Sequence, residues 1–174
     1  MSECFSKGDY IRYSSNGVCL IEDIRKLDYA GKNNTNDFYI LVPVNNRSST
    51  IYVPVNNAEL TSRMRRILSK EEIDQIIESV KLGEVTWIED RRERSENFKA
   101  ILKRCDSLEL MRLVSCIYLK KQDLIASGKK LSAYDDNILT QAENMVEDEF
   151  SFVLNLDGLQ VGRYIREKLG ISEN

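Results

Sequence analysis

The spacing of apolar residues changes once along the 174-residue chain, and this change constrains the fold more than any other feature of the sequence. Short runs rich in Ile, Val, Tyr and Phe fill the first third and are separated by turn-forming stretches such as SSNG and NNRSS. Such runs are typical of strands joined by turns. From residue 69 onward, apolar residues recur every three or four positions, as on the buried face of a helix. The sequence therefore predicts an α+β protein with two domains, residues 1–66 and 67–174.

The N-terminal domain is expected to be a small, bent antiparallel β-sheet of four or five strands. The runs with strand composition are FSKGDYIRY, GVCLIEDIRKLDY, DFYILVPV and TIYVPV. Pro43 and Pro54 fall at strand ends, where a missing N–H does least damage. The run TIYVPV is predicted to lie near an edge of the sheet. Such an edge can accept a strand from a partner, or a loop of the same chain can cover it.

The C-terminal domain is expected to be a compact bundle of about five helices. Three helix starts carry N-capping pairs, which are Ser69 with Glu72, Asp106 with Glu109, and Ser132 with Asp135. The first helix is expected to end at Gly83, and a short last helix to run from about Gly158 to Leu169. The carboxylates at 135–136 and 147–149 are predicted to lie on solvated helix faces rather than to form an acid–base pair.

The composition excludes most catalytic devices. The chain contains no histidine, so it has neither a Ser-His nor a Cys-His couple, and it lacks the glycine-rich phosphate-binding motifs. The four cysteines are widely spread, include no CxxC pair and are expected to be free thiols in a reducing cytoplasm. No metal site, cofactor or membrane span is expected. The sequence therefore predicts a cytoplasmic binding protein and not an enzyme.

Charge is distributed unevenly along the chain. Residues 87–130 carry 11 Lys/Arg and 7 Asp/Glu, whereas residues 131–174 carry 3 and 9. The only tryptophan, Trp87, begins the basic segment and is followed by cations at Arg91, Arg92, Arg94, Lys99, Lys103 and Arg104. A tryptophan among cations can stack on bases or wedge between base steps while the cations contact phosphates. It can also be a core residue at a domain junction, with the cations on a solvated face.

Two sequence blocks resemble the CarD/CdnL family of bacterial transcription regulators. The first is F-x-x-G-D-x-[VI]-x-Y-x-x-x-G-V, which runs from Phe5 to Val18 and is shared with the RNA-polymerase-interacting module of the transcription-repair coupling factor. The second is IYVPVNNAE at residues 51–59. The helical second half, with one tryptophan near its start, is also similar. The resemblance implies a Tudor-like (SH3-like barrel) N-terminal domain followed by a helical DNA-binding domain.

The resemblance also implies a partner for each domain. The β-domain would dock on the β-subunit of RNA polymerase by edge-strand pairing, through the strand that contains Thr50, Ile51, Tyr52, Val53 and Pro54. The helical domain would lie on promoter DNA at the upstream edge of the melted bubble. There Trp87 would wedge into the minor groove, without base specificity, and stabilise the open complex. We expect a monomer, with a domain-swapped dimer through the exposed edge as the alternative.

A second hypothesis keeps the polymerase-docking β-domain but gives the helical domain a protein partner instead of DNA. Glu89 and Asp90 separate Trp87 from Arg91, which makes the surroundings of the tryptophan less positive than in better-known members of the family. The acidic segment 131–174 also favours this hypothesis.

Overall fold

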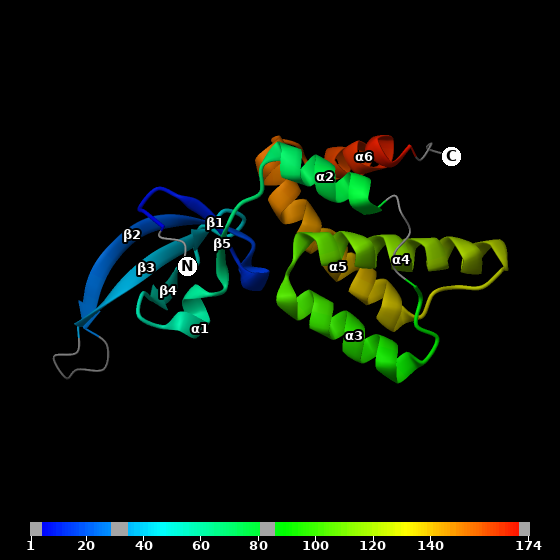
Figure 1. Cartoon of the computed structure of the whole chain (residues 1–174), viewed down its shortest axis with the longest axis horizontal. Helices are drawn as coiled ribbons and strands as arrows, with labels where there is room; N and C mark the ends of the chain where they lie inside the picture. Colours follow the sequence, from blue (N-terminus) through cyan, green and yellow to red (C-terminus); the bar gives the residue numbers. More distant parts are fainter. Residues whose placement is uncertain (1–4, 29–34, 81–85, 171–174) are drawn as a thin grey trace. The chain divides into compact units, whose positions relative to one another are not determined.

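The computed structural model describes residues 5–28, 35–80 and 86–170 (Figure 1). The chain divides into two compact units, residues 1–67 and 68–174. The first unit contains a β-sheet and the second a set of helices, which is the α+β arrangement expected from the sequence. Cys4 and Gly83, for which the sequence predicts a free thiol and a helix end, lie outside the described residues.

The first unit is built on a five-stranded antiparallel sheet. Its strands are β1 (Tyr10–Tyr13), β2 (Val18–Asp28), β3 (Thr35–Pro43), β4 (Ile51–Pro54) and β5 (Met64–Arg66). They lie in the order β4-β3-β2-β1-β5, so β4 and β5 form the two edges. The edge position predicted for the TIYVPV run is confirmed, and each proline is the last residue of its strand.

The core of this unit lies against one face of the sheet, because alternate side chains of a strand point to the same side. Ile11, Ile21, Leu41 and Val53 belong to it and have no solvent-exposed surface. The pairing of β2 with β3 shifts in register just after Ile21, which marks a β-bulge. A bulge bends a strand and increases its twist, and β2 is visibly curved in Figure 1.

Two short elements follow β4. Helix α1 (Ala58–Thr61) starts after Asn57, whose side chain accepts a hydrogen bond from the Leu60 N–H at 3.1 Å. Strand β5 follows and pairs with β1. Its three residues, Met-Arg-Arg, lack the β-branched or aromatic composition of a strand, so the pairing with β1 decides the structure there.

The described part of the second unit contains five helices. They are α2 (Lys70–Val80), α3 (Arg91–Arg104), α4 (Ser107–Ala126), α5 (Ala133–Leu154) and α6 (Gly158–Leu169). Helices α4 and α5 are the longest and supply most of the core, including the fully buried Leu113, Ile117, Ala142 and Phe150. Within the described residues, the predicted helical content of this half of the chain is confirmed.

The predicted helix starts are confirmed by their hydrogen bonds. The Ser69 N–H donates to the Glu72 carboxylate at 2.8 Å, and the Glu72 N–H donates to the Ser69 hydroxyl at 3.2 Å. The side chains of Asp106 and Ser132 accept from the backbone of α4 and α5 in the same way. These contacts satisfy N–H groups that have no partner within the helix.

Two carboxylates predicted to be solvated are buried instead, so the prediction is wrong for Asp135 and Glu149, which are 2% and 0% exposed. Glu149 accepts hydrogen bonds from the Ser107 hydroxyl at 2.9 Å and from the Leu68 N–H at 3.1 Å. The donors of Glu149 are 42 and 81 residues away in sequence. Helical spacing places a residue on a face, but it does not reveal such distant partners.

Candidate functional site

Trp87 is half-buried at the edge of the helical core, just before α3. The ring of Phe98 approaches it edge-on, with a centroid distance of 6.0 Å and an interplanar angle of 67°. The Arg94 guanidinium lies 4.4 Å from the centroid of the indole, and the Lys120 ammonium lies 5.3 Å from it. Cations at these distances are attracted to the electron-rich faces of the ring. Trp87 is therefore held by two cations and one aromatic ring.

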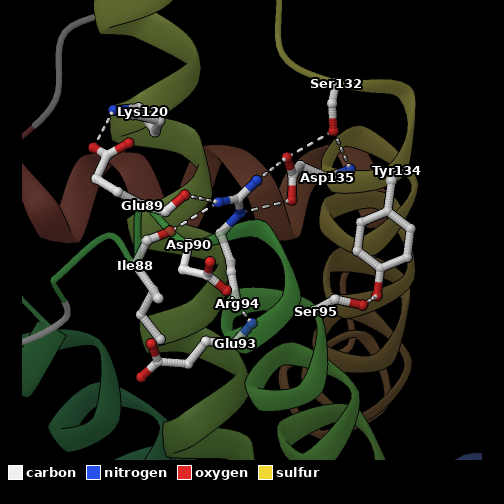
Figure 2. Close-up of polar contacts among 10 residues, drawn as sticks. All are labelled: Ile88, Glu89, Asp90, Glu93, Arg94, Ser95, Lys120, Ser132, Tyr134 and Asp135. Atoms are coloured by element: carbon white, nitrogen blue, oxygen red, sulfur yellow. Dashed lines mark hydrogen bonds and ion pairs between the residues drawn. The ribbon is translucent and has the colours of Figure 1, made fainter.

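Arg94 fixes the segment that contains Trp87. Its guanidinium donates two hydrogen bonds of 3.2 Å to the two carboxylate oxygens of Asp135 on α5. It also donates to the backbone carbonyls of Ile88 at 2.8 Å and Glu89 at 3.1 Å (Figure 2). A planar guanidinium can make these bonds at once because its donors point in fixed directions. Arg94 thus links the residues after Trp87 to both α3 and α5.

The position of Arg94 changes the interpretation of the basic segment. The residue is only 8% exposed, and Asp135 and the two carbonyls surround its donors. A phosphate would have to displace these partners to reach the guanidinium. We therefore assign Arg94 to positioning Trp87 and remove it from the expected phosphate contacts.

Further hydrogen bonds hold Asp135 and the start of α5 in place. The Ser132 hydroxyl donates to the Asp135 carboxylate at 2.6 Å, and the Asp135 N–H donates back to the Ser132 oxygen at 3.1 Å. Beside them, the Ser95 and Tyr134 hydroxyls are 2.8 Å apart and join α3 to α5. Figure 2 shows these contacts around the same guanidinium. The support of Trp87 is thus continuous from α3 to the cap of α5.

The two acidic residues after Trp87 each have a partner. Glu89 accepts from the Lys120 ammonium at 3.0 Å, which compensates its charge beside the indole. Asp90 caps α3 by accepting a hydrogen bond from the Glu93 N–H at 2.8 Å. Its negative charge at the helix N-terminus also interacts favourably with the helix dipole. Sequence reasoning missed Lys120 because it lies on α4, 31 residues after Glu89. The available signal was the lysine pair 120–121, which follows the apolar stripe of α4.

The remaining cations of α3 are exposed but do not share one surface. With about 3.6 residues per turn, Arg92, Lys99 and Lys103 fall on one face of the helix. Glu96 lies on that face too and pairs with Arg92 at 3.2 Å. Arg104 is on another side and pairs with Glu109 at 2.7 Å. Arg91 is exposed at the first turn.

Strand β4 presents one backbone edge. Its register pairs Val53 with Tyr39 and Tyr52 with Ile40, and the Val55 N–H donates to the Asp37 carbonyl at 2.8 Å. Hydrogen-bonded and non-bonded pairs alternate in an antiparallel ladder, so the N–H and C=O of Tyr52 point away from β3. Thr50 and Tyr52 are exposed, Ile51 and Pro54 are half-buried, and Val53 is fully buried. Within the described residues, β4 pairs only with β3.

Residues 5–28, 35–80 and 86–170 contain no cluster of three or more acidic or cysteine side chains that could hold a metal ion. The three cysteines in these ranges, Cys19, Cys105 and Cys116, are buried and form no disulfide. Among the helices described, none is long and apolar enough to cross a membrane.

Comparison with known families gives one match. Residues 5–68 match the model described as the CarD-like/TRCF RID domain. The match covers the described part of the β-unit and reaches the start of the helical unit. A comparison with curated proteins gives no match.

Proposed function

We propose that the chain is a non-enzymatic transcription regulator, because residues 5–68 match the CarD-like/TRCF RID domain, an RNA polymerase β-subunit interaction domain. It docks on the polymerase through its β-unit and contacts promoter DNA through its helical unit. The DNA contact lies at the upstream edge of the transcription bubble and stabilises the open complex. The family match supports the first contact, and the surroundings of Trp87 support the second.

Edge-strand pairing is the proposed mode of docking. The observation behind it is the outward-pointing backbone of Tyr52 in an edge strand that is otherwise paired only with β3 in the described chain. A strand of the β-subunit would add to β4 through these groups. The exposed Tyr52 ring, 54% accessible, would lie beside the added strand and contribute side-chain contacts.

Trp87 is the proposed DNA wedge. The single observation that carries this proposal is an indole that is partly exposed, yet held by Arg94, Lys120 and Phe98. A ring held in position loses little conformational entropy when it enters a base step, which favours insertion. Lys99 and Lys103, on the exposed face of the adjoining helix, and Arg91 at its start are the proposed phosphate contacts, with Arg92 shared between phosphate and Glu96.

The proposed effect on transcription is a shift of population. A protein that binds the open complex more tightly than the closed one moves the equilibrium by that difference in affinity and by no more. The direction of the effect on transcript output then depends on whether opening or promoter escape limits the rate.

A protein-interaction adaptor is the second candidate function. The packing of Trp87 against the helical core, the burial of Arg94 and the presence of Glu96 among the α3 cations favour it. In this case the helical unit binds a protein, and only the polymerase docking is shared with the first candidate.

The salt dependence of binding separates the two candidates. We expect the Lys99→Gln/Lys103→Gln variant to bind polymerase–promoter complexes with a log affinity versus log salt slope shallower by about 1.8, at about 0.9 per phosphate contact. Arg104→Gln is the matched control, because its cation is on another side of α3 and paired with Glu109. An unchanged slope in the double variant would favour the adaptor.

A further inference from the structure

The helical unit contains a cavity to which α3 contributes no residue. It has a volume of about 250 Å³ and lies between α4, α5, α6 and the end of α2. Its apolar lining includes Val80, Met111, Val114, Val146, Ile165 and Leu169. A dry apolar cavity of about 150 Å³ binds benzene, so this cavity has room for one bulky apolar group.

A glycine keeps one wall of the cavity open. Gly162 lines it from the interior of α6, where glycine destabilises a helix relative to alanine. Its backbone does not require glycine, because it is not among the residues with positive φ. A Cβ at this position would have one described atom within 4 Å, the Nη1 of Arg166 at 3.4 Å. The missing side chain therefore provides space and satisfies no backbone constraint.

Two carboxylates one helical turn apart on α5, those of Glu143 and Glu147, line the same cavity. Burial raises the pKa of both, and repulsion from Glu147 raises the pKa of Glu143 further. In the part of the chain that the structure describes, neither has a hydrogen-bond or ion-pair partner. Lys121, which acts on Glu143 through its charge, is paired with Asp136 at 2.7 Å. Arg166 lines the cavity as well, so the wall combines apolar surface with two carboxylates and one cation, and its net negative charge would be stabilised by a further cation.

We propose that this cavity binds a helix of a protein partner that carries one bulky apolar residue and, one turn away, an arginine or lysine. The apolar side chain would fill the cavity, and the cation would meet Glu143 and Glu147. Tyr118 and Leu119 also line it and are 38% and 57% exposed, so apolar surface continues outside the cavity. A partner helix covers that surface, whereas a small ligand leaves it in water. Nucleic acid is disfavoured because the carboxylates would repel phosphates. The proposal holds whether or not the helical unit also binds DNA.

Labelled peptides test the proposal on the full chain by fluorescence anisotropy. The probe is a capped helical peptide of about 15 residues, long enough to be partly helical alone, with tryptophan and arginine at positions i and i+4. Two matched peptides replace the arginine with glutamate or the tryptophan with alanine. We expect the probe to bind and each matched peptide to bind at least about tenfold more weakly, a difference of about 1.4 kcal/mol.

Variants of the protein locate the binding. Gly162→Leu fills the cavity and is expected to weaken binding of the probe at least about tenfold. Gly162→Ala is the control, since it gives a similar gain in helix propensity but leaves most of the space. The Glu143→Gln/Glu147→Gln variant should bind the arginine peptide no better than the glutamate peptide, because Arg166 then remains as the charged residue of the lining. This variant decides the question if Gly162→Leu does not fold.

Three results would overturn the proposal. The first is equal binding of the probe by Gly162→Leu and Gly162→Ala. The second is an undiminished preference for the arginine peptide over the glutamate peptide in the double glutamine variant. The third is absence of probe binding to the wild type at concentrations up to about 1 mM. This last result would mean that the cavity is a packing defect, and Gly162→Leu would then only stabilise the fold.

Discussion

Arg94 is the residue on which the arrangement around Trp87 most depends. It stacks on the indole, bonds two carbonyls of the segment that follows it, and forms a two-bond ion pair with Asp135. The ion pair is almost completely buried, with side-chain exposures of 9% and 3%. A buried charge that loses its partner is strongly unfavourable, because the interior does not replace the lost solvation.

Arg94→Ala is therefore expected to lower the free energy of unfolding by about 3–5 kcal/mol, since it leaves Asp135 as a buried, uncompensated carboxylate. Urea denaturation measures this loss, and the emission of Trp87, the only tryptophan, should shift to the red as its cover is removed. Arg92→Ala is the control on the same helix. Its pair with Glu96 is solvent-exposed and is expected to contribute less than about 1 kcal/mol. A loss below about 1 kcal/mol for Arg94→Ala would contradict this account of the residue.

The sequence identified Arg94, Glu89 and Asp90 near Trp87 but not their roles. All of the α3 cations look alike in sequence, and the feature that separates Arg94 from the others is Asp135, 41 residues away. Lys120 is likewise distant in sequence from its partner, Glu89, 31 residues away. Asp90 was judged by its charge, whereas its main contact is a local one, the cap of α3. Contacts with residues distant in sequence determine these roles, and the spacing of residues along one helix does not reveal such contacts.

At the level of elements, the edge strand β4 carries the docking proposal. Tyr52 has an outward N–H that an added strand could use, and its own pair with Ile40 does not use it. Proline at this position removes the donor without removing a bond of the sheet, and edge strands tolerate proline.

We expect Tyr52→Pro to weaken binding to the polymerase β-subunit by about tenfold, corresponding to one lost hydrogen bond of roughly 1 to 1.5 kcal/mol. Tyr52→Ala is the matched control, because it removes the same ring but keeps the N–H. Affinity measured by biolayer interferometry, with melting curves to verify folding, compares the two. Equal affinities would show that the side chain and not the backbone makes the contact.

Helix α5 should give the protein a pH-dependent stability. Burial raises the pKa of Glu143 and Glu147, so the folded protein holds these protons more tightly than the unfolded chain does. The contribution of these two groups to the free energy of unfolding therefore falls as the pH rises. The fall begins at about 4.3, the ordinary pKa of glutamate, and continues through the folded pKa values.

Glu147→Gln is accordingly expected to be more stable than the wild type at pH 7. The difference should disappear below about pH 4, where the Glu147 carboxyl group of the wild type is protonated in the folded and in the unfolded state. Urea denaturation across this range measures it. The exposed Glu167→Gln is the control on a neighbouring helix. A gain that persists unchanged at low pH would contradict the role of ionisation.

Elements with strong local signals were predictable from the sequence. The capping pairs at Ser69, Asp106 and Ser132 determine helix starts through contacts three residues away, so a reader of the sequence can find them. Strand β5 could not be found in this way, because its structure comes from pairing with β1. The cavity could not be found either, since four helices contribute to it.

For the whole molecule, the central claim is that one chain connects RNA polymerase to promoter DNA. The β-unit matches the CarD-like/TRCF RID domain and is proposed to dock on the polymerase, and the helical unit is proposed to hold Trp87 at the edge of the bubble. A chain attached to the polymerase acts at high effective concentration, so even a weak contact between tryptophan and DNA can prolong the open complex.

The lifetime of the open complex with wild type and Trp87→Ala tests this claim most directly. Trp87 packs against the core, so Leu113→Ala, which removes a fully buried side chain, serves as a control for loss of stability. Each protein is tested separately with the same purified polymerase. We predict a long open-complex lifetime with wild type and with Leu113→Ala, and a short one with Trp87→Ala. A folded Trp87→Ala protein that prolongs the open complex as well as wild type would contradict the account.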